Sequence, residues 1–170
     1  MNTRPADVTR RTAVHSDGDG LSHTRILRIS WMLLFISLSY VIVTAGWIAS
    51  ENRSLLPLME LLTIWSAVAV LLLMVEIHRG AADAHRSGSL TAVLLTAAMA
   101  AVTISNHFLY LTVLPQLYPE GQMPPWLLLD GWPSITKGLE CAAWALLLGL
   151  AMLFAATPAR RLGRPVEWTL

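Results

Sequence analysis

Four long apolar segments, separated by polar turns, restrict what this chain can fold into more than any other feature. They cover about residues 26–49, 54–78, 88–113 and 134–157. Each can cross a hydrocarbon core of about 30 Å, which needs about 20 helical residues. None alternates with the two-residue period of a membrane β-barrel, and a helix pairs its own backbone groups in lipid. The sequence therefore predicts an all-α, integral membrane four-helix bundle.

Composition supports a membrane protein and excludes several kinds of site. Only 14% of the residues are charged, whereas a soluble domain carries about 25%. The single cysteine, Cys141, excludes an internal disulfide, two-cysteine redox chemistry and a four-cysteine metal site. The basic residues flank the apolar segments and form no nucleic-acid-binding module. The expected partners are the lipid bilayer and a small lipophilic molecule, with a homodimer or a membrane partner subunit as alternatives and no nucleic acid.

The distribution of lysine and arginine predicts the orientation, because basic residues are retained on the cytoplasmic side. Only Arg53 and Lys137 lie on one side of the predicted bundle. The other side holds Arg4, Arg10, Arg11, Arg25, Arg28, Arg79, Arg86, Arg160, Arg161 and Arg164. Both termini are therefore expected to be cytoplasmic in a multi-pass protein of the cell membrane. Residues 1–25 are expected to form a disordered cytoplasmic tail because they lack apolar clusters, and residues 158–170 a basic cytoplasmic tail.

The connection between the third and fourth segments, residues 114–133, differs from the two short connections. Five prolines interrupt it, so no continuous helix is expected there: Pro115, Pro119, Pro124, Pro125 and Pro133. It is also too apolar for a solvated loop, with Trp126, Leu127, Leu128, Leu129 and Trp132. We expect an interfacial extracytoplasmic segment that lies on the outer membrane surface or covers the mouth of the bundle as a lid.

Three ionisable residues are predicted to share one layer of the outer leaflet. Glu60 lies six residues inside the outer end of its segment, which is about 9 Å at 1.5 Å per residue. Glu140 lies at a similar depth in its own segment. The third segment runs in the opposite direction, and His107 lies six residues before its outer end, so His107 falls in the same layer. Asn106 shares this layer. The common depth favours one pocket over three unrelated sites.

Helical spacing extends this layer into a larger candidate site. Residues three and four positions apart lie on one helix face, and each segment carries polar or aromatic residues at this spacing. On the first segment, Ser37 precedes Tyr40 and Thr44 at this spacing. The candidate ligand-binding residues are Tyr40, Thr44, Glu60, Thr63, Thr103, Asn106, His107, Tyr110, Lys137, Glu140 and Trp144. Ionisable groups in a membrane usually face the bundle interior or a water-filled cavity. The alternative is that these groups only hydrogen-bond one another and fix helix packing.

Other patterns are weaker. Glu76, His78, Asp83 and His85 are potential metal ligands, but a solvated turn between helices is favoured there, and no metal site is predicted. His78 and His107 would lie at opposite ends of the bilayer and cannot share one haem iron, so no cofactor is predicted. Pairs of small residues four apart favour helix packing, with a homodimer as the alternative: Ala97 and Ala101, Gly138 and Ala142, and Ala145 and Gly149.

One stretch resembles small multispanning bacterial proteins: Gly131-Trp132-Pro133-Ser134, then Leu139-Glu140 and Ala143-Trp144. This resemblance covers only that stretch and implies no activity. Small multidrug transporters place an essential glutamate in their first helix, and the first apolar segment here has no acidic residue. Emopamil-binding-type sterol isomerases also use glutamates and a histidine in a membrane pocket, but their motifs do not align with this chain.

These patterns favour a membrane protein whose Glu/His pocket binds or transports a small lipophilic or cationic molecule, with coupling to protons. A Glu–His–Glu cluster can hold a proton at neutral pH, which suits such coupling. The first alternative is an intramembrane acid–base enzyme, a cyclase or isomerase of a hydrophobic isoprenoid-like substrate, with Glu60, His107 and Glu140 as catalytic residues. The second alternative is a non-catalytic membrane subunit.

Overall fold

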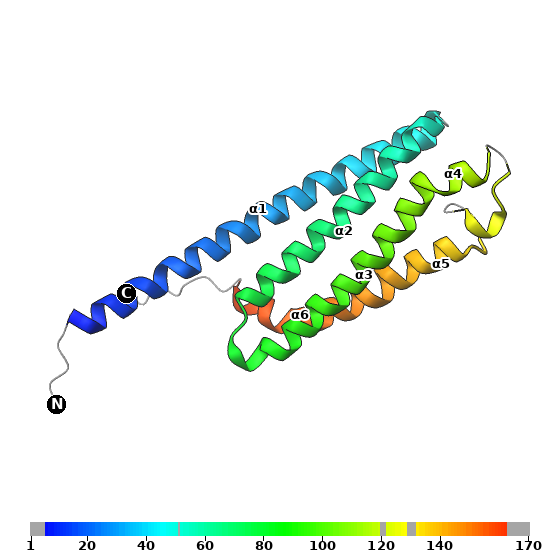
Figure 1. Ribbon diagram of the computed structural model, residues 1–170. Helices are drawn as coiled ribbons and strands as arrows, with labels where there is room; N and C mark the ends of the chain where they lie inside the picture. The colour runs from blue at the N-terminus through cyan, green and yellow to red at the C-terminus, as the bar shows by residue number, and fades with distance from the viewer. Residues whose placement is uncertain (1–5, 51, 120–121, 129–131, 163–170) are drawn as a thin grey trace.

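The computed structural model describes residues 6–50, 52–119, 122–128 and 132–162, and every regular element within these ranges is a helix. The long helices are α1 (Ala6–Ser50), α2 (Leu56–Arg79), α3 (Arg86–Thr112) and a fourth made of α5 (Ile135–Cys141), the π-helical η4 (Ala142–Leu147) and α6 (Leu148–Leu162). The short ones are η1 (Arg53–Leu55), η2 (Asp83–His85), α4 (Leu114–Leu117) and η3 (Pro125–Leu127). Figure 1 shows the four long helices running side by side, with α1 and the fourth helix on the two flanks.

The predicted all-helical fold is confirmed, with four helices long and apolar enough to cross a membrane. The segments with this property are Thr24–Ser50, Leu56–Arg79, Asp83–Leu117 and Ile135–Ala156. They correspond closely to the four apolar segments expected from the sequence.

The ends of the first and last helices differ from the expected boundaries. Helix α1 begins at Ala6 and not near residue 26, because the polar stretch contains no proline after Pro5 and can continue the helix of the apolar span. Residues 1–5 of the expected disordered tail lie outside the described residues, and disorder of residues 1–25 stays a prediction. Helix α6 likewise continues to Leu162. Residues 163–170 of the expected basic tail lie outside the described part.

Local signals at the helix ends explain where α2 and α5 begin and end. Pro57 lies in the first turn of α2, where the missing backbone N–H costs nothing. Gly80 follows α2 and donates its amide to the carbonyl of Glu76, at 3.1 Å. Helix α5 begins after Ser134, whose hydroxyl accepts a hydrogen bond from the amide of Lys137, at 3.4 Å.

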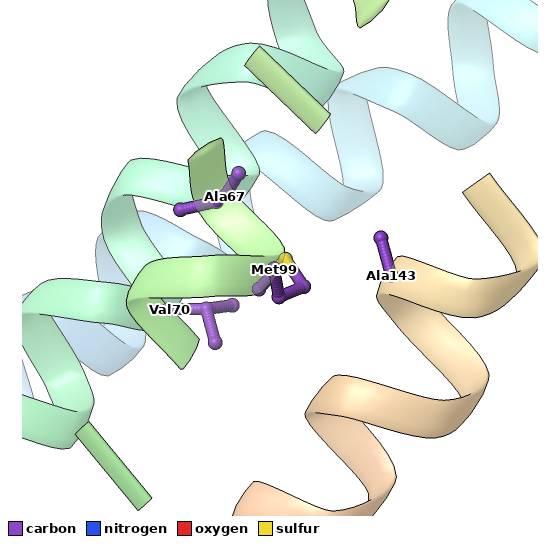
Figure 2. Close-up of a cluster of buried hydrophobic side chains, with 5 residues drawn as sticks. Ala67, Val70, Met99 and Ala143 are labelled. Atoms are coloured by element: carbon purple, nitrogen blue, oxygen red, sulfur yellow. The ribbon is translucent and has the colours of Figure 1, made fainter. Parts of the chain in front are cut away.

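The core lies between α2, α3 and the fourth helix, whereas α1 packs mainly along α2. Ala67, Val70, Met99 and Ala143 are buried at its centre (Figure 2). A second buried group, nearer the α2–α3 turn, contains Met74, Ala92, Ala151 and Ala155. Small side chains at these positions let the helix backbones approach closely. The described part of the bundle therefore has a three-helix core with α1 attached to one side.

The small residues that pack this core are not those that the sequence pattern selected. On the fourth helix the buried small residues are Ala143, Ala151 and Ala155. Ala142, Ala145 and Gly149 are exposed. A Cβ atom added at Gly138 or Gly149 would meet nothing within 4 Å. The interpretation of these pairs as packing faces within the bundle is therefore wrong for the fourth helix, and the homodimer alternative stays a prediction.

The segment before α5 folds back onto the start of that helix. The Thr136 hydroxyl lies 2.9 Å from the carbonyl oxygen of Leu127 and 3.1 Å from that of Leu128. The Ser134 hydroxyl donates to the carbonyl of Trp126, at 3.2 Å. Leu129, at the end of this apolar stretch, lies outside the described residues. These contacts position η3 against the end of the bundle where Glu60 and His107 lie.

Candidate functional site

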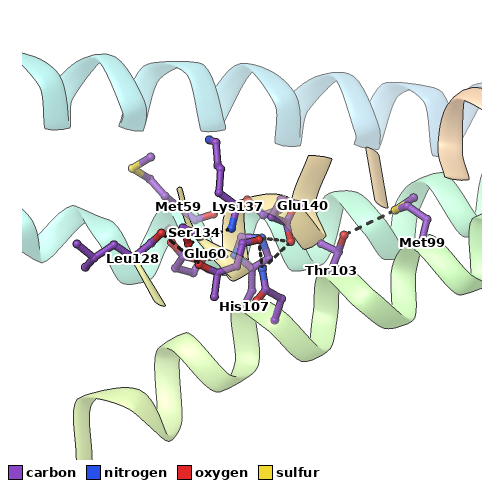
Figure 3. Close-up of polar contacts among 12 residues, drawn as sticks. Met59, Glu60, Met99, Thr103, His107, Leu128, Ser134, Lys137 and Glu140 are labelled. Carbon is purple, nitrogen blue, oxygen red and sulfur yellow. Dashed lines mark hydrogen bonds and ion pairs between the residues drawn. The ribbon is translucent and has the colours of Figure 1, made fainter. Parts of the chain in front are cut away.

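Side chains from three helices meet in one buried cluster, as the common depth of the residues predicted. Nδ1 of His107, on α3, is hydrogen-bonded to Oε2 of Glu60, on α2. Nε2 of the same ring lies 3.1 Å from Oε1 of Glu140, on α5 (Figure 3). The exposed fraction is 7% for Glu60 and 6% for His107. Both ring nitrogens therefore face carboxylates in a place from which water is largely excluded.

Asn106 completes this three-helix cluster (Glu60, Asn106, His107 and Glu140). Its side-chain amide donates to Oε1 of Glu140, at 3.1 Å, and to the backbone carbonyl of Thr136, at 3.2 Å. The Thr136 hydroxyl is in turn bonded to the segment before α5. Asn106 thus fixes the Glu140 carboxylate and links it to the chain that folds over the end of the bundle.

One buried polar atom of this region, Oγ1 of Thr44, has neither a hydrogen-bond partner nor an ion-pair partner among the described residues. Nε2 of His107 makes no hydrogen bond of good geometry, but it pairs with Oε1 of Glu140 at 3.1 Å. Most buried polar groups in proteins are satisfied, and each exception calls for an explanation. Here both atoms belong to residues that line the same cavity.

This cavity has a volume of about 560 Å³, within the range of roughly 300–1,000 Å³ that is usual for small-molecule sites. Residues of α1 form one wall of the cavity, and residues of α5 and η4 form the other. Between these walls, the lining includes Glu60 from α2 and His107 from α3. The lining residues are Ser37, Tyr40, Val41, Thr44, Trp47, Leu56, Met59, Glu60, Thr63, Ser66, His107, Lys137, Glu140 and Trp144.

The fourth helix changes its hydrogen-bonding pattern next to this cavity. The π-helical η4 begins two residues after Glu140 and contains Trp144, which lines the cavity. Such π-helical turns are uncommon, and they occur frequently at functional sites. The wider turn places Trp144 beside the cavity and leaves Ala143 in the core.

The structure brings most of the predicted ligand-binding residues to this cavity. Those that line it are Tyr40, Thr44, Glu60, Thr63, His107, Lys137, Glu140 and Trp144. Thr103 is buried in the packing, with its hydroxyl 3.9 Å from the sulfur of Met99. Asn106 is buried behind Glu140, and Tyr110 is half-buried and not among the lining residues. These three share a helix face with His107 but do not line the cavity.

Sequence reasoning missed some lining residues. Ser66 follows Thr63 at the helical spacing that selected the other candidates, so spacing could have found it. Ser37 was placed on the polar stripe of the first segment but was left out of the candidate set. The remaining ones are apolar, namely Val41, Trp47, Leu56 and Met59. Nothing in the sequence distinguishes such residues from those that face lipid.

The residues near the α2–α3 turn form a separate turn cluster (Glu76, His78, Arg79 and Ser89). Nδ1 of His78 lies 2.8 Å from the Ser89 hydroxyl, and Arg79 forms an ion pair with Glu76 at 3.1 Å. The expected solvated turn is seen only in part, because Asp83 is exposed whereas Glu76 and Ser89 are buried. Within the described residues, no group of three or more His, Cys, Asp or Glu side chains is arranged to hold a metal ion.

Comparisons of this chain with known protein families, with characterised proteins and with solved structures found no match.

Proposed function

We propose that this chain is a multi-pass membrane protein whose cavity binds a small lipophilic or cationic molecule, and that binding is coupled to proton release. The observation that carries the proposal is the Glu60–His107–Glu140 cluster on the wall of a cavity that also contains the unpartnered hydroxyl of Thr44. An unsatisfied buried polar group costs about 1–3 kcal/mol. A ligand that hydrogen-bonds the Thr44 hydroxyl recovers that cost on binding.

The membrane setting and the orientation belong to the same proposal. The four apolar helices suit a bilayer, and the excess of basic residues on one side of the bundle supports a cytoplasmic location of both termini. With this orientation, the three-helix cluster lies in the outer leaflet and the turn cluster lies at the cytoplasmic surface. The cavity is then a site that takes its ligand from the outer half of the membrane.

Proton coupling follows from the chemistry of the cluster. Glu60 and Glu140 both contact His107, and an incoming cation favours the form of the cluster with fewer protons, because like charges repel. Cation binding should therefore release protons to water. The cluster would act both as the binding site and as the source of those protons.

The test uses the protein in lipid nanodiscs with tetraphenylphosphonium as the probe, measuring affinity and proton release in weak buffer. Wild type should bind the probe, and Glu60→Gln and Glu140→Gln should each bind at least about tenfold more weakly, which corresponds to ~1.4 kcal/mol. Proton release should be lost in both variants. Glu76→Gln is the matched control, because Glu76 is also a buried carboxylate but lies in the turn cluster. Undiminished proton release in Glu60→Gln would refute the coupling.

A second function, intramembrane acid–base catalysis, is favoured by the way His107 is held. Glu60 fixes Nδ1, which leaves Nε2 toward Glu140 and the cavity. A carboxylate that orients a histidine in this way is typical of general acid–base sites. One carboxylic acid would protonate a carbon–carbon double bond, and a basic group of the cluster would take a neighbouring proton, so that the double bond moves.

This second function predicts the exchange of carbon-bound hydrogen. Isoprenoid alkenes of increasing length, incubated with the protein in heavy water, should gain deuterium on carbon, as measured by mass spectrometry. Glu140→Gln should stop the exchange while the alkene still binds. Equal exchange in wild type and Glu140→Gln would exclude this role for the cluster.

A further inference from the structure

Helix α1 is held less closely than the other three long helices. None of its most apolar 18-residue window is buried, whereas the buried shares are 28%, 33% and 17% for the windows of the second, third and fourth spans. Among the described residues, this helix packs most extensively against α2 and makes a smaller contact with η1. The first helix therefore covers α2 on one side and leaves its other side facing outward.

The cavity lies in the gap between this helix and the fourth helix. Tyr40 and Val41 line the cavity from α1, yet their exposed fractions are 37% and 60%. Glu140 and Trp144 line it from the opposite flank. In Figure 1, α1 and the fourth helix lie on opposite sides of the α2–α3 pair. Because Tyr40 and Val41 line the cavity and are also exposed, the cavity reaches the surface of the bundle beside α1.

The cavity runs along the helices as a groove, so it can hold an elongated group. On α1 its lining extends from Trp47 to Ser37, and on α2 from Leu56 to Ser66. A separation of ten residues along a helix corresponds to about 15 Å at 1.5 Å per residue. The three-helix cluster contacts this groove part of the way along it.

The charges in the groove favour a cationic group. Glu60 and Glu140 carry two carboxylates, and His107 is the one basic group in contact with them among the described residues. The cluster therefore has two acidic side chains and one basic side chain. Lys137 also lines the groove, but it is exposed, and its side chain extends away from the cluster in Figure 3. Two acidic groups beside one basic group favour a cationic ligand over an anionic one, because opposite charges attract.

We propose that the ligand is a single-tailed amphiphile with a cationic head, and that it enters sideways between α1 and the fourth helix. Its head binds at Glu60 and Glu140, and its tail lies along the groove past Val41 and Trp144 into the hydrocarbon. This inference rests on the proposed binding function and adds to it the ligand class and the route.

The experiment blocks the gap without changing the cluster. Val41→Trp narrows the groove from the α1 side, and Ser37→Trp does the same one helical turn deeper. Ile42→Trp is the matched control, because Ile42 is exposed on the same helix but does not line the groove. The probes are dodecylammonium and ethylammonium, which share a head group, and binding of each is measured with the protein in nanodiscs.

Val41→Trp and Ser37→Trp should weaken dodecylammonium binding at least about tenfold, while ethylammonium binding stays within about twofold of wild type. Ile42→Trp should leave both probes within that range. Unchanged dodecylammonium binding in both groove variants, or an equal loss with Ile42→Trp, would overturn the sideways route. If tetraphenylphosphonium binds in a Glu60-dependent way in that case, the proposed function survives and this inference alone fails. If wild type binds no cation, both fall.

Discussion

The three-helix cluster and the turn cluster contain the same kinds of residue but are built differently. In the turn cluster, partners are close in sequence: Arg79 pairs with Glu76, and His78 contacts Ser89 across a tight turn. In the three-helix cluster, His107 contacts Glu60, which is 47 positions away in the sequence. Asn106 contacts Glu140, which is 34 positions away. The first arrangement closes a turn. The second joins three helices and leaves polar atoms facing a cavity, which a purely structural contact does not need.

The largest expected effect comes from removing the centre of the three-helix cluster. His107→Ala leaves Glu60 and Glu140 buried without their basic partner, so the free energy of unfolding should fall by about 3 kcal/mol. His78→Ala in the turn cluster removes one side-chain contact, with Ser89 of the next helix, and should cost about 1 kcal/mol or less. Denaturant or thermal unfolding of the purified variants measures both. Equal losses would mean that the two clusters do not differ in the way proposed.

A triple substitution separates structural need from function at the same site. Glu60→Leu, His107→Leu and Glu140→Leu together remove every charge of the three-helix cluster, so no unpaired charge is left. Replacing a buried ion cluster by apolar residues is often neutral or stabilising. The triple variant should therefore fold at least about as stably as wild type and bind no cation. A strongly destabilised triple variant would favour a packing role for the cluster.

An intermediate effect is expected at Asn106, which positions Glu140 without lining the cavity. Asn106→Ala leaves the carbonyl of Thr136 and one oxygen of Glu140 without their donor, and the free energy of unfolding should fall by about 1–2 kcal/mol. Cation affinity should fall as well, because the carboxylate is no longer fixed. Asn106→Asp keeps the size but removes the donor, so it should not restore binding. Wild-type affinity in both variants would argue against a positioning role.

The smallest and most selective effect is expected at Thr44. Thr44→Val removes a buried hydroxyl that has no partner among the described residues, so the free protein should be unchanged or more stable by up to about 1 kcal/mol. Ligand affinity should fall instead. Thr96→Val is the matched control, because the buried Thr96 hydroxyl donates to the carbonyl of Ala92 at 2.8 Å, and its loss should destabilise. Equal destabilisation by both substitutions would mean that the Thr44 hydroxyl is satisfied.

Part of this site could be predicted from the sequence because depth in a helix depends only on position along it. Glu60, His107 and Glu140 were expected in one layer, and they meet there. Helical spacing alone could not separate Thr103 and Tyr110 from the cavity-lining residues. A shared helix face is broad, and the position of the neighbouring helices decides which part of it meets the cavity and which part is buried in packing.

Apolarity and length by themselves predicted the four helices, because a segment that is to cross a bilayer can pair all its backbone groups within itself only as a helix. The rotation of each helix about its axis was decided only by the tertiary structure. Ala143 faces the core and its neighbour Ala142 faces outward, because successive residues are separated by about 100° around a helix with 3.6 residues per turn. The gap beside α1 was decided in the same way. The gap depends on which helix packs against which. The four helices have similarly apolar surfaces, so the sequence does not indicate which pairs of helices pack together.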